Sequence, residues 1–205
     1  SVPCTSECPE SRAGSSIAIM ARFRLKSRDH LDTPEKKRTF NEQLFTAIST
    51  EYPWMKRVLS FDRDRAWKRT MVGALPPLEK PRCVDLACGN GDIARLLARR
   101  YPDGEVVGLD LTAAMLQQAQ QRPHLPNLHF LQGDVCATGL QSASFDVVTA
   151  GYALRNAPRL DDCLAEIARL LRNGGRAALL DFSRADAAFG RLLQRACLHT
   201  WTTMW

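Results

Sequence analysis

The feature that most constrains the fold of this chain is an alternation of short apolar runs with longer amphipathic runs after Pro81. The short runs are rich in Val and Leu, as buried strands are, whereas the longer runs repeat apolar residues every three or four positions, as helices do. Strands are expected at 83–87, 105–110, 128–131, 145–150 and 176–181, and helices at 92–100, 112–121, 159–172 and 185–204. This alternation predicts an α/β fold with a parallel sheet and helices on both faces.

A glycine turn, Cys88-Gly89-Asn90-Gly91, joins the first expected strand to the first expected helix. Because the two glycines carry no Cβ, a ligand can approach the backbone closely. The helix that follows begins with backbone N–H groups that lack a partner inside the helix, and such groups suit a carboxylate or a phosphate. The turn therefore predicts a ligand site at the carboxyl end of the sheet.

Acidic residues accompany three of the expected strands near this turn. Asp85 precedes the turn, Asp110 ends the second strand nineteen residues after Gly91, and Asp134 follows the third strand. Asp110 is predicted to accept hydrogen bonds from a ribose diol. The three acids are expected to converge on one crevice.

An adenine site is predicted around Asp134, whose carboxylate can accept a hydrogen bond from the adenine amino group. Val135 and Met115 are expected to pack against the adenine ring, and Leu111 is assigned to the cofactor site. The alternative for Asp134 is a structural role as the cap of a turn or helix.

Two cofactor classes fit the glycine turn on spacing alone. The run from Gly89 to Ala94 satisfies the dinucleotide pattern GxGxxA, so an NAD-dependent enzyme stays open. The position of Asp85 before the turn distinguishes the two, because an acid there disfavours a pyrophosphate and favours a cation. S-adenosylmethionine carries an ammonium, a sulfonium and no phosphate, so the acids favour S-adenosylmethionine as the cofactor.

The 205 residues are enough for one domain. We expect a disordered extension over 1–19, or a segment ahead of a start at Met20. One S-adenosylmethionine-dependent domain is then expected over 20–205, with N-terminal cap helices at 20–80 and a Rossmann-like core at 81–205. Thr33-Pro34-Glu35 predicts a helix start, with a capping Thr and Pro in the first turn. No apolar run is long enough to span a bilayer.

The net charge of +6 arises near the N-terminus, because residues 20–82 hold 15 Lys and Arg against 8 Asp and Glu. This excess fits anionic lipid headgroups or nucleic acid, or simply a solvated helix face. The seven cysteines form no CxxC pair and no zinc-ligand spacing, so we expect a reducing compartment and no metal.

Several runs together resemble the ubiquinone/menaquinone biosynthesis C-methyltransferase family. They are VDLACGNGD, VVGLDLTAAML, FLQGD, SFDVVTAGYALRN and LRNGGRAALLDFS, with WKR and its neighbours upstream, and the likeness covers about Phe40 to Ser183. The resemblance implies a class I methyltransferase fold with S-adenosylmethionine as cofactor. Its cofactor residues would be Asn90, Asp110, Asp134, Val135 and Gly151, and its catalytic residues Tyr52, Asp92, Arg155 and Asn156.

These catalytic assignments have plausible chemistry and plausible alternatives. Arg155 can stabilise the phenolate that makes a quinol ring carbon nucleophilic, while Asn156 orients the ring and Tyr52 closes the pocket or relays a proton. Alternatively, Arg155 pairs with Asp161 or Asp162, and Asn156 serves as a turn residue. Asp92 fits an acid at a helix N-terminus, or a cofactor ligand, at least as well as a catalytic group.

The resemblance implies a function, partners and a location. The expected reaction is C-methylation of a polyprenylated benzoquinol or naphthoquinol in ubiquinone or menaquinone biosynthesis, with peripheral membrane contact, no nucleic acid, and a homodimer or biosynthetic complex. The expected location is the cytoplasm, at the inner membrane face, or the mitochondrial matrix or a plastid in a eukaryote.

Family members continue beyond the position of Trp205, so the strand pair that ends their sheet is expected to be absent here. Methylation of a soluble or specialised aromatic metabolite is one alternative function. A non-catalytic or truncated scaffold is the other.

Overall fold

A parallel sheet organises the part of the chain that the computed structural model describes, which is residues 33–50, 52, 54, 60 and 63–181. Its strands are β1 (Arg82–Leu86), β2 (Glu105–Asp110), β3 (Leu128–Gln132), β4 (Phe145–Gly151) and β5 (Leu171–Leu180). All neighbouring pairs run parallel, in the order β3-β2-β1-β4-β5. The predicted parallel α/β fold is confirmed, and helices connect β1 to β2, β2 to β3 and β4 to β5 as crossovers between parallel neighbours.

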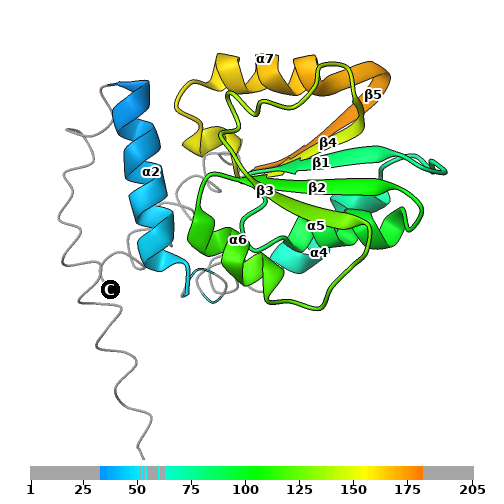
Figure 1. Cartoon of the computed structure of the whole chain (residues 1–205), viewed down its shortest axis with the longest axis horizontal. Helices are drawn as coiled ribbons and strands as arrows, with labels where there is room; N and C mark the ends of the chain where they lie inside the picture. The colour runs from blue at the N-terminus through cyan, green and yellow to red at the C-terminus, as the bar shows by residue number, and fades with distance from the viewer. Residues whose placement is uncertain (1–32, 51, 53, 55–59, 61–62, 182–205) are drawn as a thin grey trace, which may run out of the picture. The chain divides into compact units, whose positions relative to one another are not determined.

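Helices cover both faces of this sheet (Figure 1). The helices are α2 (Pro34–Ile48), α4 (Asp64–Gly73), α5 (Asp92–Arg100), α6 (Ala113–Gln120) and α7 (Leu160–Leu170), with a short 3-10 helix, η3 (Leu154–Asn156). In Figure 1, α7 lies on one face, and α4 and α5 lie on the other. The carbonyl oxygens of Ala119 and Pro123 accept hydrogen bonds from Arg95, which holds the end of α6 against α5.

Two apolar clusters result from the alternation of side chains along the strands. Val84 and Leu86 of β1 face α7 and pack with Ile167 and Leu170. Cys83, one position earlier, faces the opposite side and packs in the cluster that holds Leu97 of α5. Both faces are thus buried, which explains why the strands read as continuous apolar runs.

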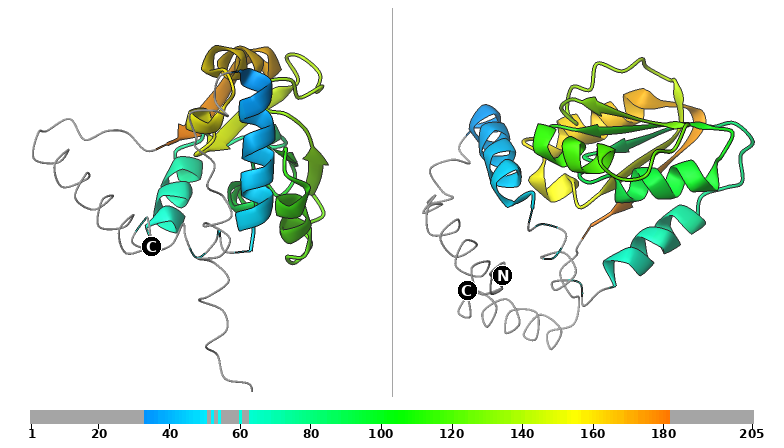
Figure 2. Two further views of the ribbon diagram at one scale, coloured as in Figure 1. Left: turned by 90° about the vertical axis from the view of Figure 1, so that its left-hand side faces the viewer. Right: turned by 60° about the horizontal axis from the view of Figure 1, so that its bottom comes forward.

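The helix α2 runs across the carboxyl ends of the strands, as the views in Figures 1 and 2 show. It begins where the sequence predicts, because the Thr33 hydroxyl accepts a hydrogen bond from the Lys36 N–H at 3.3 Å and Pro34 occupies the first turn. Asn41 on α2 donates a hydrogen bond to the Asn156 carbonyl at 2.6 Å, so α2 is tied to η3. This placement closes one side of the crevice above the strand ends.

Two boundaries differ from those predicted. The strand expected at 176–181 begins at Leu171, and the helix expected to reach 172 ends at Leu170. Phe145 pairs with Leu171 but Val147 pairs with Arg176, so β5 contains an irregular register there. Gly174, at a φ of +79°, permits this irregularity.

Several expectations fall outside the described residues. They are the disordered extension at 1–19, the helix at 185–204 and the missing strand pair after Trp205. Among the described residues, no helix has both the length and the apolar character needed to cross a membrane.

Candidate active site

The glycine turn has the open backbone that the sequence predicts. Gly89 and Gly91 adopt φ values of +55° and +77°, which favour glycine, and Gly91 is the residue that precedes α5. A Cβ on Gly91 would lie 2.9 Å from the Phe130 ring, whereas a Cβ on Gly89 would meet no atom within 4 Å. The turn therefore packs against the protein at Gly91 and leaves free space at Gly89.

Asp85 supports this turn from inside the protein. The side chain is fully buried, and its carboxylate accepts hydrogen bonds from the Ala94 N–H at 3.0 Å and from the Thr149 hydroxyl at 2.8 Å. Burial raises the pKa of Asp85 to about 7, although both hydrogen bonds oppose the shift. Asp85 is absent from the pocket wall, so the structure does not place it against a ligand as the sequence reading expected.

Asp110 lines the pocket at the end of β2, where the sequence places the ribose acceptor. Its two carboxylate oxygens accept hydrogen bonds from the Gly89 N–H at 2.7 Å and the Thr112 N–H at 2.8 Å. A carboxylate has about four acceptor positions, so these two backbone contacts do not exhaust its capacity to accept from a diol. Burial raises the pKa of Asp110, although hydrogen bonds from Gly89 and from the backbone and side chain of Thr112 oppose the shift.

Asp134 caps a turn and also lines the pocket. One carboxylate oxygen caps a turn by accepting the Cys136 N–H at 2.9 Å, and the other lies 3.2 Å from Nε of Arg38 on α2. Val135 and the buried Met115 lie on the same pocket wall. The structure thus brings the predicted adenine residues together, with Arg38 beside them.

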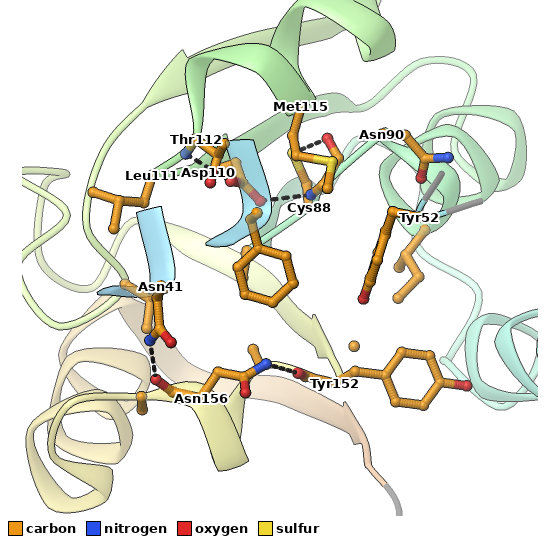
Figure 3. A pocket seen from close by; sticks show the side chains of 18 of the residues that line it. Asn41, Tyr52, Cys88, Asn90, Asp110, Leu111, Thr112, Met115, Tyr152 and Asn156 are labelled. Atoms are coloured by element: carbon orange, nitrogen blue, oxygen red, sulfur yellow. Dashed lines mark hydrogen bonds between the residues drawn. The ribbon is translucent and has the colours of Figure 1, made fainter. Parts of the chain in front are cut away.

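One pocket, partly open to solvent, has these residues in its wall and encloses about 940 Å³ of space when the solvent at its mouth is included. Figure 3 shows Asp110, Leu111 and Thr112 on one side, and Tyr52, Asn90 and Tyr152 on the other. Predicted site residues in its wall are Tyr52, Gly89, Asn90, Asp92, Asp110, Leu111, Met115, Asp134, Val135, Gly151 and Asn156; Asp85, Gly91 and Arg155 are outside it.

Two tyrosines, Tyr52 and Tyr152, also line the pocket. The Tyr52 ring packs edge-on against Phe45, with 5.6 Å between ring centroids. Burial raises the pKa of Tyr52, although the positive charges of Arg155 and Lys68 oppose this, so its hydroxyl stays protonated at neutral pH and can donate a hydrogen bond. Tyr152 has a φ of +59°, which is strained for a residue other than glycine, and such strain is frequent at functional sites.

Arg155 and Asn156 follow Tyr152 but differ in their placement. The Asn156 side chain lines the pocket and donates to the Tyr152 carbonyl at 3.2 Å. The Arg155 guanidinium pairs with Asp181 and lies over the Tyr152 ring at 5.3 Å. The alternative pairing predicted for Arg155, with Asp161 or Asp162, is wrong, because the partner comes from the end of β5.

Asp92 is both the first residue of α5 and part of the pocket wall. Its carboxylate pairs with Nζ of Lys68 at 3.0 Å and with the Arg122 guanidinium at 2.7 Å. Lys68, on α4, is nearly fully buried and also pairs with Asp64 at 2.8 Å. The sequence does not predict that Lys68 lines the pocket. The spacing of four residues between Asp64 and Lys68 does indicate an ion pair on one helix face.

Comparison with known proteins identifies the family of the chain. Residues 32–197 match the model of the ubiE/COQ5 methyltransferase family. The chain is 41% identical over 162 residues to a 2-phytyl-1,4-naphtoquinone methyltransferase of Thermosynechococcus vestitus, and this match covers 78% of the chain and 72% of the relative. It is 39% identical to a ubiquinone/menaquinone biosynthesis C-methyltransferase of Dinoroseobacter shibae, over 69% of the chain but only 58% of that relative.

Among solved structures, the fold is similar to that of a putative methyltransferase of Haloferax volcanii, solved with its Trm112 activator. The TM-score is 0.57 at 28% identity, over 66% of this chain and 58% of the other. The predicted class I methyltransferase fold is confirmed, and S-adenosylmethionine is the cofactor of this class. On its sequence match, its fold and its pocket, the chain belongs to the ubiE/COQ5 methyltransferase family.

Proposed function

We propose that this protein transfers a methyl group from S-adenosylmethionine to a ring carbon of a lipid-tailed quinol. The observation that carries the proposal is a pocket whose wall holds the predicted nucleoside residues Asp110 and Asp134 together with Tyr52 and Asn156. The relatives support the acceptor class, because their names specify naphthoquinone and ubiquinone or menaquinone substrates.

The pocket residues fit the cofactor. Asp110 retains acceptor positions for the ribose hydroxyls, and Asp134 can accept from the adenine amino group once its contact with Arg38 loosens. The free space above Gly89 leaves room for the ligand beside the backbone. When bound, S-adenosylmethionine supplies an electrophilic methyl group whose bonding electrons stay on sulfur.

A second group of pocket residues, Phe45, Tyr52 and Asn156, can orient an aromatic acceptor. Tyr52 offers a protonated hydroxyl, Asn156 offers an amide, and Phe45 contributes an apolar wall. A quinol ring carbon becomes nucleophilic when an adjacent hydroxyl loses its proton to solvent. After the new carbon–carbon bond forms, the ring carbon releases its own proton and the oxygen is reprotonated, so the net release is one proton. Alignment and exclusion of water then account for most of the rate.

Peripheral contact with an anionic membrane is a second part of the proposal, because the acceptor carries a lipid tail. Exposed basic residues on or beside α2 and α4 support it, namely Lys36, Arg63, Arg65 and Arg69. Flotation of the full chain with vesicles containing phosphatidylglycerol tests this contact. Binding is expected at low salt and should weaken at high salt, whereas no binding at either would contradict it.

Turnover with labelled cofactor tests the reaction. The full chain in mild detergent is incubated with S-adenosylmethionine that carries a CD₃ group and with a chemically reduced demethylnaphthoquinone or demethylbenzoquinone that bears a short prenyl tail. We expect a CD₃ group on a ring carbon, located by mass spectrometry and NMR. The same headgroup without its tail is the matched control and should react more slowly.

Other outcomes would overturn the proposal in defined ways. Cofactor binding with no methylation of any quinol, together with turnover of a water-soluble phenol, would support a methyltransferase of soluble metabolites. Cofactor binding without turnover of any acceptor would support a scaffold role instead.

A further inference from the structure

Lys68 is a buried ammonium group in the wall of the pocket. Its side chain is only 5% exposed, and Nζ lies 2.8 Å from Asp64 Oδ2 and 3.0 Å from Asp92 Oδ2. An ammonium has three N–H donors. Within the described part of the chain these two carboxylates are its hydrogen-bond acceptors, so one donor is left for a ligand.

The charge of Lys68 persists despite burial. Burial by itself lowers the pKa of Lys68, but the carboxylates of Asp92 and Asp64 outweigh it and the pKa is raised. Lys68 is therefore a permanent cation at neutral pH and does not serve as a base. A buried cation with a remaining donor is a strong site for an anionic oxygen.

The position of Lys68 specifies which part of a ligand it can meet. Its partner Asp92 directly follows the glycine turn. The Nζ atom of Lys68 lies 5.8 Å from the centroid of the Tyr152 ring. Arg38 is the other basic residue among the described pocket-lining side chains, and Asp134 holds it in the adenine region. Lys68 therefore serves the region beyond the ribose, next to the turn.

We propose, resting on the function above, that Lys68 binds the carboxylate of the amino-acid head of S-adenosylmethionine. That head is a zwitterion, with a carboxylate and an ammonium on one carbon. The Lys68–Asp92 ion pair offers a positive and a negative charge 3.0 Å apart, which matches such a head. The N-terminus of α5 adds a favourable field for the carboxylate.

Titration calorimetry of the full chain with two nucleosides tests this assignment. S-adenosylhomocysteine carries the amino-acid head, and 5′-methylthioadenosine lacks it. Wild-type protein should bind S-adenosylhomocysteine more tightly. Lys68→Met should weaken the binding of S-adenosylhomocysteine about 10- to 100-fold, as expected for the loss of a charged hydrogen bond. The affinity for methylthioadenosine should change less than about threefold. Lys68→Arg should retain most of the preference for S-adenosylhomocysteine over methylthioadenosine. Lys80→Met, at an exposed lysine, should retain all of this preference.

A purely structural role for Lys68 would affect both nucleosides equally, and that result would overturn the inference. Unchanged binding of S-adenosylhomocysteine in Lys68→Met would also overturn it. Lys68→Met leaves Asp64 without its cation and leaves Asp92 with Arg122 alone. The variant Lys68→Met/Asp64→Asn restores the net charge, and the same selective loss is expected. Wild-type protein that binds both nucleosides equally contradicts this inference alone, whereas wild-type protein that binds neither contradicts the proposed function as well.

Discussion

Replacement of Gly89 by Ala separates the role of the turn in cofactor binding from its role in folding. Gly89 adopts a φ of +55°, so an alanine there is strained by about 1–2 kcal/mol. A Cβ at this position meets no protein atom within 4 Å, so no clash adds to the strain. For a chain of this size the expected decrease in melting temperature is about 2–8 °C.

Gly89→Ala should reduce the affinity for the cofactor in addition to lowering the stability of the fold. The added methyl group would occupy space that the ligand fills, and overpacking by one methyl group costs about 1–3 kcal/mol. The dissociation constant of S-adenosylhomocysteine is therefore expected to rise about 5- to 150-fold. Titration calorimetry gives this constant, and thermal unfolding without ligand gives the stability change.

Gly139→Ala is the matched control for this experiment. Gly139 has a φ of +70°, a Cβ there also meets no atom within 4 Å, and the residue is exposed outside the pocket. It should lower the melting temperature by a similar amount and leave cofactor affinity unchanged. Equal loss of affinity in the two variants, or no loss in Gly89→Ala, would refute the assignment of the turn to the cofactor site.

Three further predictions follow from the same region. Gly91→Ala should destabilise the protein by about 1–3 kcal/mol more than Gly139→Ala in urea unfolding, because its Cβ would lie 2.9 Å from Phe130; equal stabilities would contradict the packing. Asp110→Asn should weaken S-adenosylhomocysteine at least about tenfold by calorimetry, since a charged acceptor of ribose is lost; an unchanged constant would argue against the ribose assignment. The folded pKa of Asp85, about 7, exceeds its unfolded value near 3.8, so Asp85 stabilises the fold below about pH 4, and this contribution is lost as the pH rises to about 7. Between pH 5 and 8 the urea midpoint of the wild type should therefore fall more steeply than that of Asp85→Asn, and parallel profiles would contradict the shift.

The sequence was sufficient to predict the elements of the core, because their signals are local. The alternation of apolar runs and the glycine turn led to a parallel sheet whose elements lie within a few residues of the observed bounds, apart from β5. Asp110 and Asp134 were also placed correctly in the pocket wall. A residue at or just beyond the carboxyl end of a strand lies at the crevice, and this holds regardless of which face of the sheet the preceding side chains point to.

Asp85 shows where such reasoning stops. It lies inside β1 and not at its end, so the two-residue alternation directs its side chain to the face covered by α5, where the Ala94 N–H binds it. Asp92, which starts α5, is the acid from this segment that reaches the pocket. The sequence predicts an acid at the cofactor beside the turn, and the structure has Asp92 and not Asp85 in the pocket wall.

Lys68 and Arg155 depend on contacts between distant segments. Lys68 meets Asp92 across 24 positions of sequence, and Arg155 meets Asp181 across 26. Both pairings are set by how α4 and β5 pack, and no local spacing indicates them. The strain at Tyr152 is likewise visible only in the backbone conformation.

Determination of the structure of the full chain with S-adenosylhomocysteine and a tailed quinone analogue tests the central claim most directly. We predict the nucleoside in this pocket, with ribose oxygens on Asp110, the adenine amino group at Asp134 and the quinone ring between Tyr52 and Asn156. A nucleoside bound away from Asp110, or a ring bound outside the pocket, would contradict the account.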